Sequence, residues 1–103
     1  MPALFPVSTQ SLIVTLWQRN QPQTLERLAL LDRAAASSSL EPTRRGEAIA
    51  IAHKFAGSLG MFGFHEGTRL ARELELELES PSPDGMILIR LTVELRASLF
   101  PAS

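Results

Sequence analysis

Apolar side chains recur every three or four residues through the first third of the chain, which is the spacing of one face of an α-helix. The pattern runs from Ser8 to about Ala36. Its members are Leu12, Ile13, Leu16, Trp17, Leu25, Leu28, Leu31 and Ala35. Pro22 lies inside the pattern, and a proline usually kinks or interrupts a helix unless it stands in the first turn. The pattern therefore predicts one long helix or two short ones, with a kink or a break near residues 20–22.

A second helix is predicted after the serine run at residues 37–39, which is typical of a turn. Glu41-Pro42 marks its start, since proline is favoured in a first helical turn. Its apolar face comprises Ala48, Ile51, Ala52, Phe55, Leu59 and Phe62. This helix carries His53 and is expected to end among Gly60 and Gly63.

A third helix is predicted from Leu70, Ala71, Leu74 and Leu78, which share one helical face. Residues 73–79 alternate strictly between Glu and Leu, a pattern that is otherwise typical of a strand. Leu and Glu favour helices, and the run has no β-branched residue. We therefore expect a helix here, preceded by a short connection or first turn at residues 63–66.

Residues 80–85 form the clearest loop in the sequence, with two prolines and an Asp-Gly pair. A fourth helix is predicted from Met86 to Phe100, although the Ile-Leu-Ile and Thr-Val content leaves a strand at its start as an alternative. Four helices, each with one apolar stripe, bury those stripes only against one another. The predicted fold is all-α, an antiparallel up-and-down four-helix bundle, formed by residues 1–103 as a single domain.

The composition of the chain excludes several classes of function. The chain has 103 residues, 45% of them hydrophobic and 20% charged, with a formal net charge of −1. These values are typical of a soluble globular domain and do not indicate a nucleic-acid partner. There is no cysteine, which excludes disulfides and thiolate chemistry. No basic leader or long apolar run is present, so we expect a cytoplasmic protein without a membrane partner.

His53 shares its helical stripe with Ile49, Ala56, Gly57 and Gly60, three of which are very small. Each glycine inside a helix costs about 1 kcal/mol relative to alanine. One interpretation is that the stripe gives a docked macromolecule access to the imidazole. The other is that the small residues allow a neighbouring helix to pack closely, and that His53 is an ordinary boundary residue. Spacing alone does not separate the two.

The stretch around His53 resembles the histidine phosphotransfer (HPt) domains of two-component phosphorelays. In that family the histidine is followed by a bulky apolar residue, a glycine and small residues. The corresponding positions here are His53, Phe55, Gly57, Ser58 and Gly60. Residues 61–64, 69–75 and 16–19 also resemble bacterial members. The resemblance is specific over roughly residues 45–79 and extends to helix pattern elsewhere.

The resemblance implies a phosphocarrier without kinase activity of its own. His53 would accept a phosphoryl group, on Nε2, from a receiver-domain aspartate or a hybrid histidine kinase, and pass it to another receiver. Access and docking would involve Lys54, Gly57, Gly60, Ala56 and Ile49. No metal site, cofactor or small-molecule substrate is expected, and the Mg²⁺ would belong to the receiver. Many family members have lysine where this chain has Ala56, which puts the strength or rate of transfer in doubt.

Other features receive simpler interpretations. Phe62 and Phe64 are expected to anchor the core or a loop, with rim contact as the alternative. The glutamates of residues 73–79 are expected to form a solvated face, and the arginines, Arg45 among them, to be ordinary surface charge. His65-Glu66 lacks the second histidine of a zinc-protease motif. The competing function is a helical adaptor, or a degenerate HPt module, that binds its partner without phosphotransfer.

Overall fold

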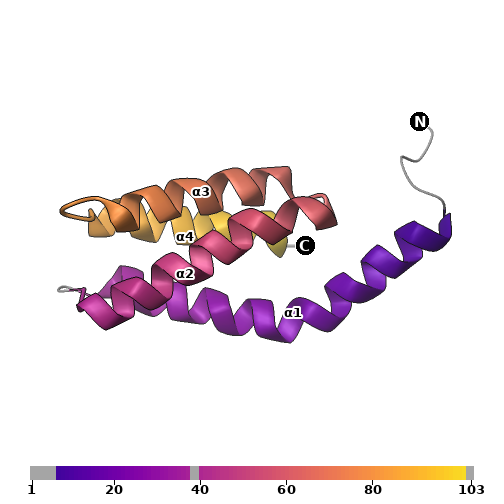
Figure 1. Ribbon diagram of the computed structural model, residues 1–103, viewed down its shortest axis with the longest axis horizontal. Coiled ribbons are helices and arrows are strands. Elements are labelled where there is room, and N and C mark those ends of the chain that lie inside the picture. The colour runs from indigo at the N-terminus through magenta and orange to yellow at the C-terminus, as the bar shows by residue number, and fades with distance from the viewer. Residues whose placement is uncertain (1–6, 38–39, 102–103) are drawn as a thin grey trace.

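The computed structural model describes residues 7–37 and 40–101. Its elements, in chain order, are α1 (Val7–Ala36), α2 (Pro42–Ser58), the 3₁₀ helix η1 (Leu59–Phe62), α3 (His65–Glu79) and α4 (Gly85–Leu99) (Figure 1). Within these ranges there is no strand, so the segment that begins near Met86 is helical from its start. The N-terminal hexapeptide and most of the serine run, Ser38 and Ser39, lie outside the described residues.

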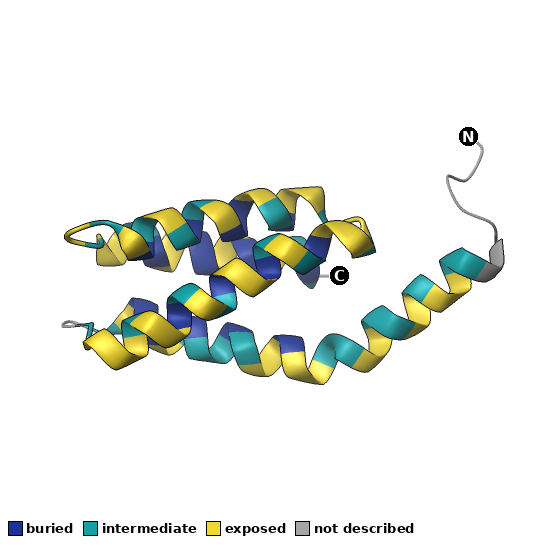
Figure 2. Ribbon diagram, viewed as in Figure 1, coloured by how far each residue is buried: buried dark blue, intermediate teal, exposed yellow. Residues whose placement is uncertain are grey.

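The four long helices form a closed ring of neighbours. α2 packs on α3, α3 on α4, α4 on α1, and α1 on α2. Their inward faces supply one core of leucine, alanine and a single phenylalanine, and the exposed positions face outward on every helix (Figure 2). The core consists of Leu28, Leu31, Ala34, Ala35, Ala48, Ala52, Phe55, Leu59, Leu70, Ala71, Leu74, Leu78, Leu88, Leu91, Leu95 and Leu99. The predicted all-α four-helix bundle is therefore confirmed.

α1 is one helix of 30 residues that contains Pro22, so of the two predicted alternatives the single long helix is correct and the break is absent. Its ribbon bends part of the way along, and its N-terminal part extends beyond the other helices (Figure 1). Leu12 is 57% exposed and Leu25 is 46% exposed, which corrects their assignment to the core stripe. Leu12 lies in the N-terminal part of α1, which the other long helices, of only 15 to 17 residues, do not cover. Leu25 lies between the buried Thr24 and Leu28, but on a side of the helix that is turned away from the core.

An aromatic cluster joins α1 to the end of the bundle where η1 leads into α3 and where α4 ends. The ring centroid of Trp17 lies 5.5 Å from that of Phe62, 4.7 Å from that of Phe64 and 5.6 Å from that of Phe100. Centroid separations of this size are typical of stabilising aromatic pairs. Phe62 and Phe64 therefore act as anchors, as expected, and they fix α1 beside η1.

The alternating Glu-Leu run is helical, as its composition predicts. Leu74 and Leu78, four residues apart, are each 1% exposed, whereas Leu76 between them is 69% exposed. A strand would place all three leucines on one face, but a helix turns Leu76 away from the other two. The glutamates that alternate with these leucines consequently point in several directions instead of forming one face.

Local backbone interactions set where the helices begin and end. The Asp84 carboxylate caps α4 by accepting hydrogen bonds from the amides of Met86, at 2.9 Å, and Ile87, at 3.3 Å. Gly63 ends η1 with a φ of 85°, in the left-handed region that favours glycine. The amide of Phe64 then donates to the Leu59 carbonyl at 3.1 Å, which closes the turn into α3. The relative orientation of α2 and α3 depends on this turn.

Arg45 is not ordinary surface charge. Its Nε donates to the Leu78 carbonyl at 2.7 Å and its Nη2 to the Ser80 carbonyl at 2.6 Å, so a half-buried guanidinium on α2 caps the C-terminus of α3. Replacing Arg45 with alanine leaves two carbonyls without this partner. We expect a loss of about 2 kcal/mol in the free energy of unfolding, measured by urea denaturation.

The neighbouring Arg44 is the matched control. It is exposed, and its one side-chain hydrogen bond to a described residue, to Ser37 Oγ, is 3.5 Å long. Arg44→Ala is expected to change stability by less than about 0.5 kcal/mol. Equal effects of the two substitutions would contradict the capping role of Arg45.

Candidate functional site

His53 stands on the outer face of α2, and its side chain is 76% exposed. The preceding residue, Ala52, is completely buried, and Phe55 is 2% exposed. Successive helical residues are rotated by about 100°, so the buried face of α2 holds its backbone against the core while His53 points outward. The exposure of His53, which spacing alone left open, thus results from the burial of Ala52 and Phe55 on the same helix.

One ring nitrogen of His53 is held by α3. Nδ1 lies 2.9 Å from Oε2 of Glu75, whose side chain is 20% exposed. A carboxylate can only accept a hydrogen bond, so Nδ1 carries the proton in this pair. The neutral tautomer with a proton on Nδ1 has its free lone pair on Nε2. The contact therefore orients the imidazole and leaves Nε2 as its nucleophilic atom.

Glu75 was missed by the sequence analysis, which assigned it to a solvated face. Its partner is 22 residues away in the chain, and the pair forms because α2 and α3 pack side by side. Glu77 also departs from that expectation, because its carboxylate accepts a hydrogen bond from the Asp84 amide at 2.9 Å. The Glu-x-Glu spacing gave no signal that would single out Glu75.

The two glycines after His53 have space around them. A Cβ built on Gly57 meets nothing within 4 Å, and one on Gly60 meets only the Thr68 hydroxyl, at 3.7 Å. Neither glycine has the positive φ seen at Gly63. Backbone conformation and helix packing therefore do not require glycine at position 57. Gly67 of α3 is different, because a Cβ there would lie 3.1 Å from a Leu59 methyl group.

The small residues around His53 are arranged differently from the predicted stripe. Ile49 and Ala56 are only partly exposed and pack against the core, so they lie on the flank of α2 and not on its crest. A line of exposed residues along α2 passes through Gly46, Ala50, His53 and Gly57, and we call this line the outer ridge. Three of these four residues have a side chain no larger than a methyl group. The sequence pattern around His53 does not single out Gly46 or Ala50.

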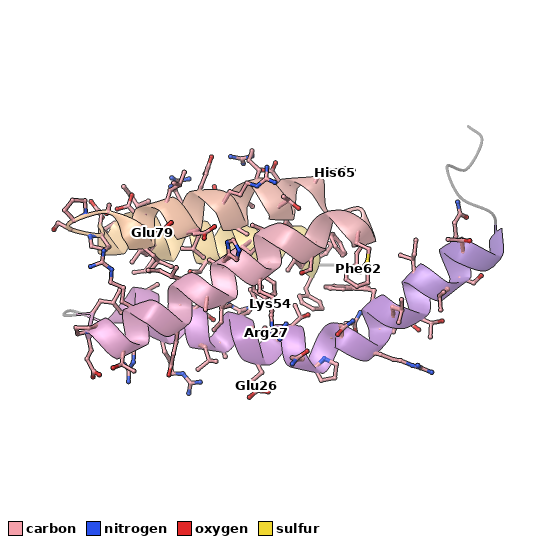
Figure 3. The ribbon with its side chains drawn as sticks, viewed as in Figure 1. Glu26, Arg27, Lys54, Phe62, His65 and Glu79 are labelled. Atoms are coloured by element: carbon pink, nitrogen blue, oxygen red, sulfur yellow. The ribbon has the colours of Figure 1, made fainter. Side chains whose placement is uncertain are left out.

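Lys54 lies on the other side of the outer ridge from Glu75. It lines a groove between α1 and α2, together with residues of η1. Figure 3 shows its side chain beside the gap that separates these two helices. Lys54 makes no ion pair with any described residue. The site therefore has a carboxylate on the α3 side of His53 and a free ammonium on the α1 side.

Arg69 on α3 is engaged with two glutamates. It pairs with Glu66 and, at 2.6 Å, with Glu73. The hydrogen bond from Arg69 lowers the pKa of the Glu66 carboxyl, and the same hydrogen bond raises the pKa of the guanidinium. Both shifts favour the charged pair at neutral pH. Arg69 is thus occupied within its own helix and is not a free cation for a phosphoryl group.

No group of three or more His, Asp or Glu side chains within residues 7–37 and 40–101 is arranged to hold a metal ion. His65 and Glu66 begin α3, and the Glu66 carboxylate is taken up by Arg69. In the same residues no helix has both the length and the apolar character needed to cross a membrane.

The fold and the position of the histidine define a class of protein. The Hpt domain model matches residues 13–98, and the chain belongs to this family. The family acts in histidine phosphotransfer within phosphorelays, and its members are phosphocarriers and not enzymes.

A curated relative shares part of the sequence. Protein RcaC of Microchaete diplosiphon is 37% identical over 62 residues, which cover 57% of this chain and 10% of the relative. The chain therefore corresponds to about a tenth of that protein's length. No solved structure shows significant similarity to the chain.

Proposed function

We propose that His53 is the phosphoacceptor of this HPt domain and that it carries a phosphoryl group from one receiver-domain aspartate to another. The observation that carries the proposal is the combination of an exposed imidazole with a carboxylate on Nδ1. The other histidine of the chain, His65, begins α3 and forms no comparable pair among the described residues. The proposal therefore concerns His53 and its Nε2 atom.

The transfer is a displacement at phosphorus. Nε2 forms a bond to the phosphorus atom while the bond to the aspartyl oxygen breaks, and that electron pair returns to the receiver as a free carboxylate. Nδ1 keeps its proton, so the ring gains positive charge as the new bond forms. The Glu75 carboxylate lies opposite that charge and stabilises it. Transfer to the next receiver reverses these bond changes.

The receiver partner supplies what this chain lacks. Phosphoryl transfer depends on in-line positioning and on neutralisation of the equatorial oxygens, for which magnesium is the usual ion. The described residues around His53 offer one carboxylate, which is already bonded to the imidazole. We therefore assign the Mg²⁺ to the receiver. This chain provides the nucleophile and the docking surface. Autonomous kinase activity is not part of the proposal.

The experiment that tests the proposal is phosphotransfer from a panel of phosphorylated receiver domains to the purified chain. The readout is phosphate on this chain that is labile in acid and stable in alkali. Labelling by at least one receiver, followed by transfer to a second receiver, is the expected result. A folded chain that binds a receiver but neither takes up its phosphate nor changes its dephosphorylation would instead support the adaptor function.

Substitutions of Gly57 separate two effects: the access of a partner to His53 and the stability of α2. Gly57→Ala adds a methyl group in open space, so it is expected to raise the free energy of unfolding by up to about 1 kcal/mol. Gly57→Leu keeps the helix stable but places a bulky side chain one turn from His53 on the outer ridge. We expect it to slow phosphotransfer by about tenfold, because close contact with the partner is lost.

The control for this pair is Gly46→Leu. Gly46 is also exposed on α2, and a Cβ there meets nothing within 4 Å, but it lies seven residues before His53, about 10 Å along the helix. Urea denaturation and transfer rates are measured for all three variants. A Gly57→Leu protein that transfers at the parent rate would contradict a role for Gly57 in access.

A further inference from the structure

A groove of about 310 Å³ runs between α1 and α2, on the side of the outer ridge opposite Glu75. Its two ends differ in character. Phe62 lies at one end, with Trp17 beside it and Met61 next to it in sequence, and the cations Arg27 and Lys54 stand at the other end (Figure 3). Met61 is 61% exposed, and methionine adapts readily to a partner's surface. The groove thus combines an adaptable apolar end with a basic end.

The charges of the groove are not balanced within the molecule. Arg27 and Lys54 face the groove from opposite helices, and Glu26, the carboxylate next to Arg27 in sequence, points away from α2 (Figure 3). No carboxylate lines the groove. In the part of the chain that the structure describes, neither cation takes part in an ion pair. The basic end is therefore available to carboxylates of another molecule.

The groove adjoins the site that the proposed function uses. Lys54 follows His53 directly in the sequence. Gly57, which belongs to the outer ridge, lies about one helical turn after these two residues. A partner that reaches Nε2 across Gly57 covers the outer face of α2 and extends over one of its two flanks. The α3 flank carries Glu75, whereas the α1 flank carries Lys54 and Arg27, which have no ion pair with a described residue. An acidic partner is attracted to the α1 flank.

We infer that the α1/α2 groove holds an acidic, amphipathic surface segment of the receiver domain, with a carboxylate at Arg27 and Lys54 and an apolar side chain over Met61. The groove then sets which receivers this HPt domain serves. It also supplies positive charge near the site in a chain that has Ala56 in place of the common lysine. The inference rests on the proposed function, because it assumes that the partner is a receiver.

Charge reversal tests the basic end. Arg27→Glu and Lys54→Glu are each expected to lower the transfer rate at subsaturating receiver by about tenfold, and to leave the rate at saturating receiver within about twofold of the parent. The parent rate should also fall with added salt, and the variants should lose most of that salt dependence. Arg19→Glu is the control, because Arg19 is an exposed arginine of α1 outside the groove.

Trp17 reports directly on the groove. It is the only tryptophan in the chain, so incorporation of 5-fluorotryptophan gives a single ¹⁹F resonance that the receiver's own residues do not obscure. Adding the unphosphorylated receiver that transfers best should shift or broaden this resonance in the parent and in Arg19→Glu. The shift should require about tenfold more receiver in Arg27→Glu. Helical circular dichroism confirms that each variant is folded.

Two results would overturn the inference while leaving the proposed function intact. One is transfer at the parent rate by both charge-reversal variants, and the other is active transfer with no change at Trp17. A ¹⁹F shift that depends on the chain's own concentration would also overturn it, since the groove would then hold a second copy. Failure of the parent to accept phosphate from any receiver would remove the proposed function and, with it, this inference.

Discussion

Replacing His53 with glutamine abolishes the acid-labile phosphate that the parent acquires from a receiver. Glutamine keeps a polar side chain at a position that is already exposed, so the free energy of unfolding should change by less than about 0.5 kcal/mol. It has no imidazole lone pair, and no other group in the described part of α2 can replace it as nucleophile. Labelling should fall to the background of the assay, a loss of at least a hundredfold.

His65→Gln is the matched control for this experiment. It removes the other histidine of the chain, which begins α3 and has no contact with Glu75 in the described residues. It should label as the parent does. Loss of labelling in His65→Gln with retention in His53→Gln would place the phosphoacceptor at position 65 and contradict the proposed function.

Glu75→Ala is the second change with a large expected effect. It removes the carboxylate that holds Nδ1, so the imidazole rotates more freely and samples the tautomer in which Nε2 is protonated. It also removes the negative charge opposite the ring as positive charge develops. We expect the transfer rate at saturating receiver to fall by about tenfold or more, the size of effect typical when a partner that orients a functional histidine is removed.

Glu75→Gln and Glu79→Gln test whether the effect is specific to the carboxylate that contacts His53. Glutamine at position 75 retains an acceptor oxygen without the charge, so its rate should lie between those of the parent and the alanine variant. Glu79 lies one turn further along α3 and is exposed, and its change to glutamine removes the same charge away from His53. Long-range ¹H–¹⁵N spectra of the imidazole measure the tautomers. Unchanged tautomers in Glu75→Ala would show that Glu75 does not position His53.

The sequence was sufficient for the helices because their signals are local. Leu74 and Leu78 lie four residues apart on a helix-forming background, and this spacing correctly outweighed the strand-like alternation around Leu76. Pro22 was harder, because its effect depends on whether neighbouring helices support the kinked segment. α1 continues through it, and no local feature distinguishes that outcome from a break.

The site was less predictable because its contacts join different helices. The exposure of His53 follows from the burial of Ala52 and Phe55 on the same helix, and the sequence contains that pattern. The contact with Glu75 depends on how α2 crosses α3, and the cap that Arg45 places on α3 depends on the same crossing. The groove is lined by residues of α1 on both sides of Pro22, so it depends on how α1 lies against α2 as well. No local pattern of residues in the sequence specifies these relative orientations.

The measurement that tests the central claim most directly is ³¹P and ¹⁵N NMR of the phosphorylated chain with ¹⁵N-labelled histidine. The chain has two histidines, so the signals can be assigned with His53→Gln and His65→Gln. The account predicts a one-bond ³¹P–¹⁵N coupling to Nε2 of His53 and a proton on its Nδ1. Coupling to Nδ1, coupling to His65, or phosphate on a residue other than histidine would contradict it.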